Sequence, residues 1–209
     1  MPQTFDTLIQ QGLQASESDD TELALQRFRE AALAVPGNGL PHFLAAGELA
    51  QVGRMQEAES AYATAVLLAP DMAIARYQLG LLQFATDRLA LALTTWQPLL
   101  ALGEDDFMRR FAQGFFAMAG EDVAEAKAQF RAGLALNTVN LPMNRDIERV
   151  LESLDEITAT LAASADPSEA SAPVVDATGE ADEADTEATS SDASAHVLLA
   201  NYQPVGKPN

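Results

Sequence analysis

The chain has 209 residues, of which 31 are acidic and 12 are basic, so its formal net charge is −19. A nucleic-acid groove needs clustered Lys and Arg to displace phosphate counterions, and this composition therefore argues against direct nucleic-acid binding. Because the chain has no cysteine and only two histidines, disulfides, thiolate metal sites and histidine-rich metal sites are excluded. Its apolar runs are much shorter than the roughly 20 residues of a membrane span, and its start lacks a secretion-signal pattern. These features predict a cytoplasmic protein without membrane insertion.

The sequence repeats at a fixed spacing, and four segments of equal length align without gaps: 5–38, 39–72, 73–106 and 107–140. One column of this alignment is always small, a second is always alanine and a third is always aromatic. In chain order the columns read Gly12, Ala46, Gly80 and Gly114; Ala24, Ala58, Ala92 and Ala126; and Phe28, Tyr62, Trp96 and Phe130. Small side chains let two antiparallel helices approach closely, so each segment is expected to form a pair of helices.

These columns resemble the tetratricopeptide repeat, a helix-turn-helix unit whose length matches that of the segments. The resemblance covers the four segments, about 136 residues, and a helix that follows them. It implies an all-α fold, a right-handed superhelical α-solenoid of helix pairs. It also implies that the first helices of successive units line a concave groove, which binds peptides or helices.

Prolines and an amphipathic segment mark the expected helix ends. Pro36 and Pro70 are expected to stop the second helices of the first two segments. Pro98 follows Trp96 inside the next second helix, where a missing backbone donor predicts a kink or an early end. Segment 144–162 carries an apolar stripe, with Asn144 as a suitable N-cap, and is expected to be a capping helix over the last unit. The solenoid domain is therefore expected to span residues 1–163.

The end of the chain has a different composition. Residues 164–195 carry nine acids, no base and few large apolar side chains, which predicts a disordered acidic linker. Residues 196–209 follow as an apolar C-terminal segment, with an island formed by Val197, Leu198, Leu199 and Tyr202. This island is a candidate docking motif that binds the groove in cis or in a second copy, at a local concentration on the order of millimolar. An unordered chain end is the alternative.

The face of each first helix that is not needed for packing within the unit is the candidate binding surface, and most of it is apolar. Its members are Asp6, Ile9, Leu13 and Ser16; Leu40, Phe43, Gly47 and Ala50; Ile74, Tyr77, Leu81 and Phe84; and Met108, Phe111, Phe115 and Met118. The predicted peptide-binding residues among them are Phe43, Ile74, Tyr77, Leu81, Phe84, Met108, Phe111, Phe115 and Met118. An open apolar patch of this size would indicate a partner. The alternative is that these residues pack on the neighbouring unit.

Motifs for chemistry are absent from the sequence: it has no phosphate-binding glycine loop followed by Lys, no HExxH and no nucleophile elbow. No catalytic residue, metal or cofactor is therefore predicted. The sequence predicts a non-enzymatic protein-interaction module that binds an apolar helix or extended peptide of a partner, or its own tail, as an adaptor or secretion-type chaperone. The alternative is a structural scaffold whose groove face is buried against another copy and whose tail recruits a larger complex. The oligomeric state is left open.

Overall fold

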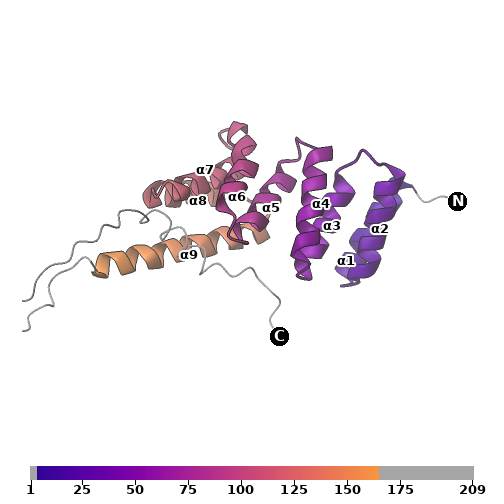
Figure 1. The fold of residues 1–209 in the computed structure, drawn as a ribbon, viewed down its shortest axis with the longest axis horizontal. Coiled ribbons are helices and arrows are strands. Elements are labelled where there is room, and N and C mark those ends of the chain that lie inside the picture. Colours follow the sequence, from indigo (N-terminus) through magenta and orange to yellow (C-terminus); the bar gives the residue numbers. More distant parts are fainter. Residues whose placement is uncertain (1–3, 165–209) are drawn as a thin grey trace, which may run out of the picture.

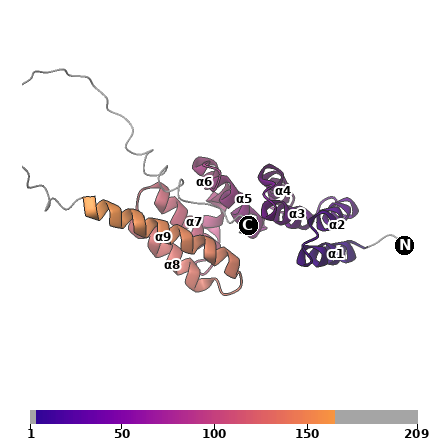
Figure 2. The ribbon, with the colours of Figure 1, turned by 90° about the horizontal axis from the view of Figure 1, so that it is seen from below.

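The computed structural model describes residues 4–164, which form helices with no strand among them (Figure 1). In chain order the elements are α1 (Phe5–Glu17), α2 (Thr21–Ala34), α3 (Leu40–Gln51), α4 (Met55–Leu68), α5 (Ala73–Phe84), α6 (Leu89–Trp96), the 3-10 helix η1 (Gln97–Ala101), α7 (Phe107–Ala119), α8 (Val123–Leu136) and α9 (Leu141–Ser164). Consecutive helices pair closely, and we number the pairs α1/α2, α3/α4, α5/α6 and α7/α8 as units 1 to 4. Figure 2 shows α1, α3 and α5 on one side of the array and α2, α4 and α6 on the other.

The small and aromatic columns hold the two helices of each unit together. A Cβ atom added at Gly80 would overlap the indole of Trp96, and Gly12 and Gly114 face Phe28 and Phe130 in the same way. The glycines therefore let an aromatic ring from the second helix lie directly against the backbone of the first. These rings are at most 1% exposed, so each contributes its apolar area to the core of its unit.

Arginines fasten the loops between units 2, 3 and 4. The guanidinium of Arg76 donates to the backbone carbonyl of Pro70, and Arg110, at the equivalent position of unit 4, donates to that of Glu104. Arg109 donates to the carbonyl of Leu102 in the same loop. These carbonyls follow the ends of α4 and η1, where helix geometry supplies no partner for them. The polar residues early in α5 and α7 thus hold each loop onto the following helix.

The second helix of unit 3 stops early, as Pro98 predicts. Helix α6 ends at Trp96 and the chain continues as η1 through Ala101. A proline at this point cannot donate the hydrogen bond that would continue the α-helix. As a result α7 packs mainly on η1 rather than on α6. In Figure 1 the helices of units 1 and 2 stand upright side by side, whereas α7, α8 and α9 run horizontally, so the array changes direction after unit 3.

Helix α9 begins at Leu141, before the predicted start at Asn144. The Asn140 side chain accepts a hydrogen bond from the Met143 N–H at 3.4 Å, as an N-cap does, and Asn144 has another role. Its side chain receives a hydrogen bond from the Asn137 amide at 2.8 Å and donates to the Asn137 carbonyl at 3.1 Å. The Asn137 amide also donates to the carbonyl of Asn140 at 2.9 Å, and its oxygen accepts from the Asn140 N–H. Asn137 is only 2% exposed and uses its polar atoms within this turn, which fixes the direction of α9.

Helix α9 covers unit 4 and part of unit 3. Its apolar stripe is buried in the same core cluster as the aromatic side chains of α5, α6, α7 and α8, and comprises Met143, Ile147, Val150, Leu151 and Leu154. An ion pair also joins α9 to α8: the Lys127 ammonium of α8 lies 2.7 Å from the Asp155 carboxylate of α9.

The predicted linker, apart from Ser164 at the end of α9, and the apolar C-terminal segment lie outside the described residues. Within residues 4–164, no helix combines the length and the apolar character that a bilayer crossing requires.

Candidate binding surface

Most of the predicted groove is part of the core. Six of the predicted peptide-binding residues, all on α5 and α7, are buried, with exposures between 0% and 7%: Tyr77, Leu81, Phe84, Phe111, Phe115 and Met118. The prediction that these side chains line an open groove is therefore wrong. The alternative interpretation of the same stripe, packing between units, describes them.

The change of direction after unit 3 explains this burial. With α7 seated on η1, its apolar face turns onto the apolar face of α5, and the Phe84 and Phe115 rings lie 5.0 Å apart. Tyr77 and Phe111 meet in the same way at 6.0 Å, and Phe115 stacks on Trp96 at 4.3 Å. Such ring pairs stabilise a core beyond the area that they bury. The surface that a regular array would have left open is thus closed on itself, and the apolar stripe of α9 joins the same core cluster.

Three of the predicted residues, Phe43, Ile74 and Met108, stay partly exposed. Ile74 and Met108 pack against the buried cluster of units 3 and 4, whereas Phe43 packs against a smaller cluster that includes Ala46 and Tyr62 of unit 2. Phe43 and Ile74 continue a partly exposed apolar surface on α1, α3 and the start of α5, which we call the first-helix face. It consists of Leu13, Leu40, Phe43, Gly47, Ala50 and Ile74, and Leu13 is its most exposed large side chain at 42%.

Tyr62 of α4 reaches the first-helix face from behind. Its ring packs against Phe43, with centroids 6.0 Å apart, and the side chain as a whole is 6% exposed. Burial raises the pKa of the Tyr62 hydroxyl to about 12, so the group is protonated at every physiological pH. The hydroxyl lies behind Gly47, a position on α3 where a Cβ atom would come within 3.9 Å of it.

Sequence reasoning placed Tyr62 in the aromatic column and missed its link to the surface. The available signal was the hydroxyl itself, because the other members of the column, Phe28, Trp96 and Phe130, have none at that position. Gly47 was placed on the candidate face but had no assigned role. A glycine in the middle of a helix is a second signal, because glycine lowers helix stability and usually has a local reason.

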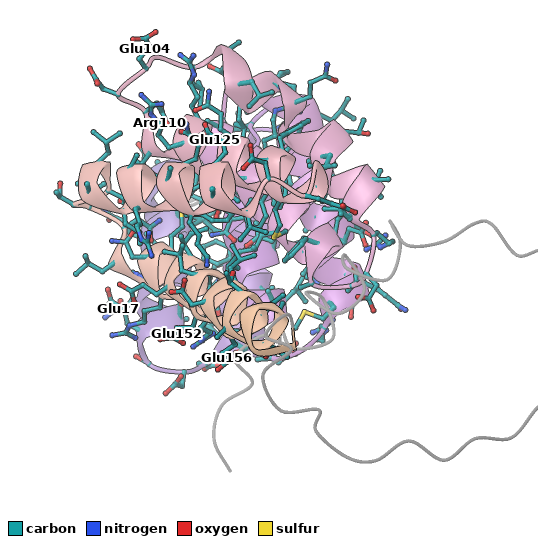
Figure 3. The ribbon with its side chains drawn as sticks, turned by 90° about the vertical axis from the view of Figure 1, so that its left-hand side faces the viewer. Glu17, Glu104, Arg110, Glu125, Glu152 and Glu156 are labelled. Carbon is teal, nitrogen blue, oxygen red and sulfur yellow. The ribbon has the colours of Figure 1, made fainter. Side chains whose placement is uncertain are left out.

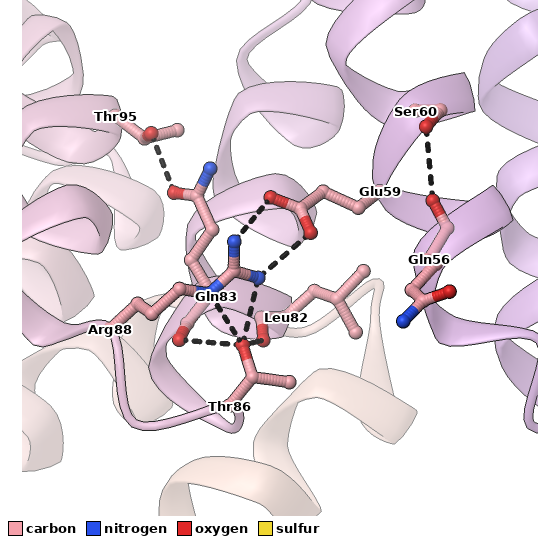
Figure 4. A network of polar contacts seen from close by, with 8 residues as sticks. All are labelled: Gln56, Glu59, Ser60, Leu82, Gln83, Thr86, Arg88 and Thr95. Atoms are coloured by element: carbon pink, nitrogen blue, oxygen red, sulfur yellow. Dashed lines mark hydrogen bonds and ion pairs between the residues drawn. The ribbon is translucent and has the colours of Figure 1, made fainter.

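Cations on the described surface are largely used within the protein. Arg88, at the start of α6, donates two hydrogen bonds to the Glu59 carboxylate of α4, at 2.9 and 2.7 Å, in a bidentate ion pair (Figure 4). This hydrogen bonding lowers the pKa of Glu59. Arg54 pairs in the same way with Glu57 and reaches Glu22 of α2 at 3.3 Å, so arginines at equivalent positions of units 2 and 3 join consecutive second helices.

The acids are in excess and many have no cation beside them. The described part contains 22 acids and 11 bases. Exposed glutamates from several parts of the chain spread over the surface seen in Figure 3, among them Glu17, Glu104, Glu125, Glu152 and Glu156. The Ser16 hydroxyl donates to the nearly buried Glu48 carboxylate, which adds an acid beneath the edge of the first-helix face. The field around the described domain is therefore negative.

Other features of the described residues do not coincide with the predicted site. A cleft of about 370 Å³ opens at the N-terminal edge of unit 1, lined by Gln11, Gln14, Ala15, Ser18, Asp20, Leu23 and Arg27. Within residues 4–164, no group of three or more His, Asp or Glu side chains is arranged to hold a metal ion. The candidate docking motif Val197, Leu198, Leu199 and Tyr202 lies outside the described residues.

Solved structures with the same architecture exist. MamA from Desulfovibrio magneticus RS-1 (residues 41 to the end) is 17% identical, with a TM-score of 0.57 over 77% of this chain and 89% of that one. A chain of the APC/C hetero-tetramer Cut9-Hcn1 is 21% identical, with a TM-score of 0.64 over 77% of this chain and 31% of that one. YrrB, described as a TPR protein with an unusual peptide-binding site, is 19% identical, with a TM-score of 0.52 over 76% and 86%.

No protein-family model and no curated protein sequence matches the chain. The structural likeness concerns the fold, and it confirms the prediction of an all-α solenoid of tetratricopeptide repeats.

Proposed function

We propose that this tetratricopeptide-repeat solenoid is a non-catalytic protein-interaction module whose binding surface is the first-helix face of units 1 to 3. Its partner is a protein segment that carries apolar side chains flanked by cations. The observation that supports the proposal most is the contrast between the two halves of the array. Most apolar side chains on this face of α5 and α7 are buried by the protein itself, whereas on α1 and α3, within residues 4–164, Leu13 is exposed and Leu40 and Phe43 are partly exposed.

Apolar side chains in contact with water favour a partner that buries them. Leu13 is 42% exposed, and Leu40, Phe43 and Ile74 are partly exposed along adjacent first helices. Covering such a surface removes apolar area from water, at roughly 25 cal/mol for each Å². Phe43 has the largest side chain of the first-helix face, and aromatic residues often contribute most to the binding energy of an interface.

Charge selects among apolar partners. The described part has 22 acids against 11 bases, and most of its arginines are engaged with carboxylates and loop carbonyls. A cationic segment is therefore attracted, whereas an acidic one is repelled. The protein's own linker, with nine acids and no base in residues 164–195, is for this reason a poor occupant of the first-helix face.

A role as an adaptor, rather than as a secretion-type chaperone alone, is supported by a second exposed surface. Leu33 of α2 and Leu67 of α4 occupy the same position of units 1 and 2, and are 76% and 77% exposed. They lie on the second helices, so they leave the first-helix face free for a different partner. The same pair is the observation that favours the alternative of a scaffold joining copies of the chain. Mass measured on dilution separates the two, because a scaffold is expected to stay associated and an adaptor to be monomeric.

A peptide-binding experiment tests the proposed surface. The probe is a fluorescent peptide of Leu and Lys with an amphipathic pattern, compared with a Leu and Glu peptide and a Ser and Lys peptide of the same length and pattern. We expect the full chain to bind the Leu and Lys peptide at least about tenfold more tightly than either control, since both apolar contact and charge contribute.

Substitutions then locate the site. Phe43→Asn is expected to weaken binding of the Leu and Lys peptide about tenfold, and Leu13→Asn several-fold, while Leu67→Asn on the second helices leaves it unchanged. Circular dichroism controls for folding, and the exposed Leu13 provides a test if Phe43→Asn unfolds. Folded Phe43→Asn or Leu13→Asn protein that binds like the original chain would overturn the proposal, as would equal binding of all three peptides.

A further inference from the structure

Gly47 differs from the other glycines inside the first helices. At Gly12, Gly80 and Gly114 an added Cβ atom would overlap an aromatic ring, so the packing of each unit demands a glycine. At Gly47 an added Cβ atom would meet one atom within 4 Å, the Tyr62 hydroxyl oxygen at 3.9 Å, which is an ordinary contact distance. The fold therefore accepts alanine at this position. A glycine here makes α3 less stable than alanine would, without a packing reason in the described residues.

The missing side chain uncovers a hydrogen-bond donor. The Tyr62 hydroxyl has no hydrogen-bond partner among residues 4–164, and burial of the ring keeps it protonated. Phe43 lies beside it on the surface, and Ala50 is one turn along α3. The hydroxyl borders the open space at Gly47, which we call the notch, so an acceptor on another chain reaches it only by coming close to the backbone of α3.

We infer that the notch between Gly47 and Tyr62 is a subsite that accepts a main-chain carbonyl of an extended partner segment, to which the Tyr62 hydroxyl donates. The inference rests on the proposed function and specifies how its partner is bound. An extended chain is favoured because it offers free carbonyls along its length, whereas a helical partner has them only in its last turn. A carboxylate is a poor acceptor here because the surrounding surface is acidic and Glu48 lies beneath the face.

The chemistry of the occupant follows from the neighbours of the notch. The residue beside the bound carbonyl packs its apolar side chain on the Phe43 ring, which is partly exposed. Cationic residues further along the segment face the acids Asp6 and Glu17, both exposed on α1. Alanine at position 47 would place a methyl group in the path of the incoming chain, so it should hinder the partner while it strengthens the helix.

Two substitutions test the subsite because each separates binding from folding. Gly47→Ala is expected to bind less well although it resists urea better than the original chain, and Tyr62→Phe is expected to bind less well with little change in structure. Gly37→Ala, in the loop after α2 where an added Cβ meets nothing within 4 Å, is the matched control for the glycine. The probe is the peptide Lys-Thr-Lys-Val-Phe-Val-Lys-Thr-Lys, whose β-branched residues favour an extended chain and whose single Phe fixes its register.

The expected changes are about three- to tenfold weaker binding for Gly47→Ala and for Tyr62→Phe, the range of one hydrogen bond, with Gly37→Ala unchanged. In a series of probes with one backbone amide replaced by an ester, the carbonyl at a single position is a weaker acceptor. We expect one ester to weaken binding to the original chain several-fold and to have no such effect on Tyr62→Phe, since the two changes remove the same bond.

The outcomes distinguish this inference from the proposed function. If Phe43→Asn abolishes binding of the probe while Gly47→Ala and Tyr62→Phe bind like the original chain, the first-helix face binds a partner and the notch is refuted. If every ester position has the same effect on the original chain and on Tyr62→Phe, the carbonyl contact is refuted. Binding that is absent, or indifferent to Phe43→Asn, overturns the proposed function and this inference with it.

Discussion

The atoms next to each glycine decide whether that glycine can be replaced by alanine. At Gly80 the backbone of α5 lies directly against the Trp96 indole, whose nitrogen donates to the Tyr77 carbonyl at 3.0 Å. A methyl group there has no room, since the ring is 0% exposed and is also stacked on Phe115. Gly47 is also a glycine inside a first helix, but an added Cβ atom there would enter open space, with only the Tyr62 hydroxyl oxygen within 4 Å among the described residues. Identical substitutions at the two positions should therefore have opposite effects.

Urea unfolding followed by circular dichroism measures this contrast. Gly80→Ala is expected to lower the free energy of unfolding by about 1–3 kcal/mol, because the indole must move out of a packed core. Gly47→Ala is expected to raise it by up to about 1 kcal/mol, the helix preference of alanine over glycine. A destabilised Gly47→Ala protein would show that the glycine serves the fold rather than a partner.

Among the helices, α9 is the first helix of a fifth unit that has no second helix among the described residues. It begins at Leu141, which aligns with Phe107 at the start of α7, so it keeps the register of the repeat. Its buried residue Ile147 faces the preceding unit, but Glu148 occupies the column that is Gly or Ala in units 1 to 4. Glu148 is exposed. A second helix could not approach at this point, and the array ends as a solvated surface.

Substitutions at adjacent positions of α9 separate its two faces. Ile147→Ala is expected to lower the free energy of unfolding by about 2–4 kcal/mol, because the side chain is 0% exposed and its loss leaves a cavity in the core cluster of units 3 and 4. Glu148→Ala is expected to change it by less than about 0.5 kcal/mol, as is usual at an exposed site. Denaturant unfolding compares the two, and equal effects would contradict a capping role for the buried stripe.

At the scale of the whole molecule, α9 carries the end of the described chain away from the first-helix face. It has 24 residues and is therefore about 36 Å long. Figure 1 shows that it ends at the opposite extremity of the molecule from α1 and α2. A flexible linker the length of residues 165–195 spans roughly 30 Å on average, so contact of the C-terminal island with the first-helix face of the same chain needs an extended linker. The acidic linker is also repelled by the acidic domain.

A chain ending at Ser164 tests the role of the C-terminal island in cis. We expect its dissociation constant for the Leu and Lys peptide at physiological ionic strength to lie within about threefold of that of the full chain, since no bound tail has to leave. Fluorescence anisotropy provides the measurement. An increase in affinity of more than about tenfold on truncation would instead show that the tail occupies the surface.

Some of this organisation was present in the sequence because local packing dictates it. The small residues that face Phe28 and Trp96 recur once in every unit, and Pro98 ends α6 by removing a donor, wherever the helix lies in space. The capping helix was visible for the same reason, since its apolar stripe has helical spacing. Its first turn was misplaced because Asn140, rather than Asn144, caps the helix, whereas Asn144 bonds to Asn137 across the preceding turn.

The sequence by itself determined the repeat, the helix pairs, the stop at Pro98 and the acidic surface, since each depends on residues near one another along the chain. Only the tertiary structure decided which apolar face is open. Tyr77, Phe84 and Phe115 have the same spacing that surface residues of a regular array would have, and they are buried because η1 sets the angle at which unit 4 meets unit 3. That angle depends on how α7 packs against η1 and α5, which the spacing of apolar residues does not reveal, because an apolar stripe looks the same whether another helix covers it or water does.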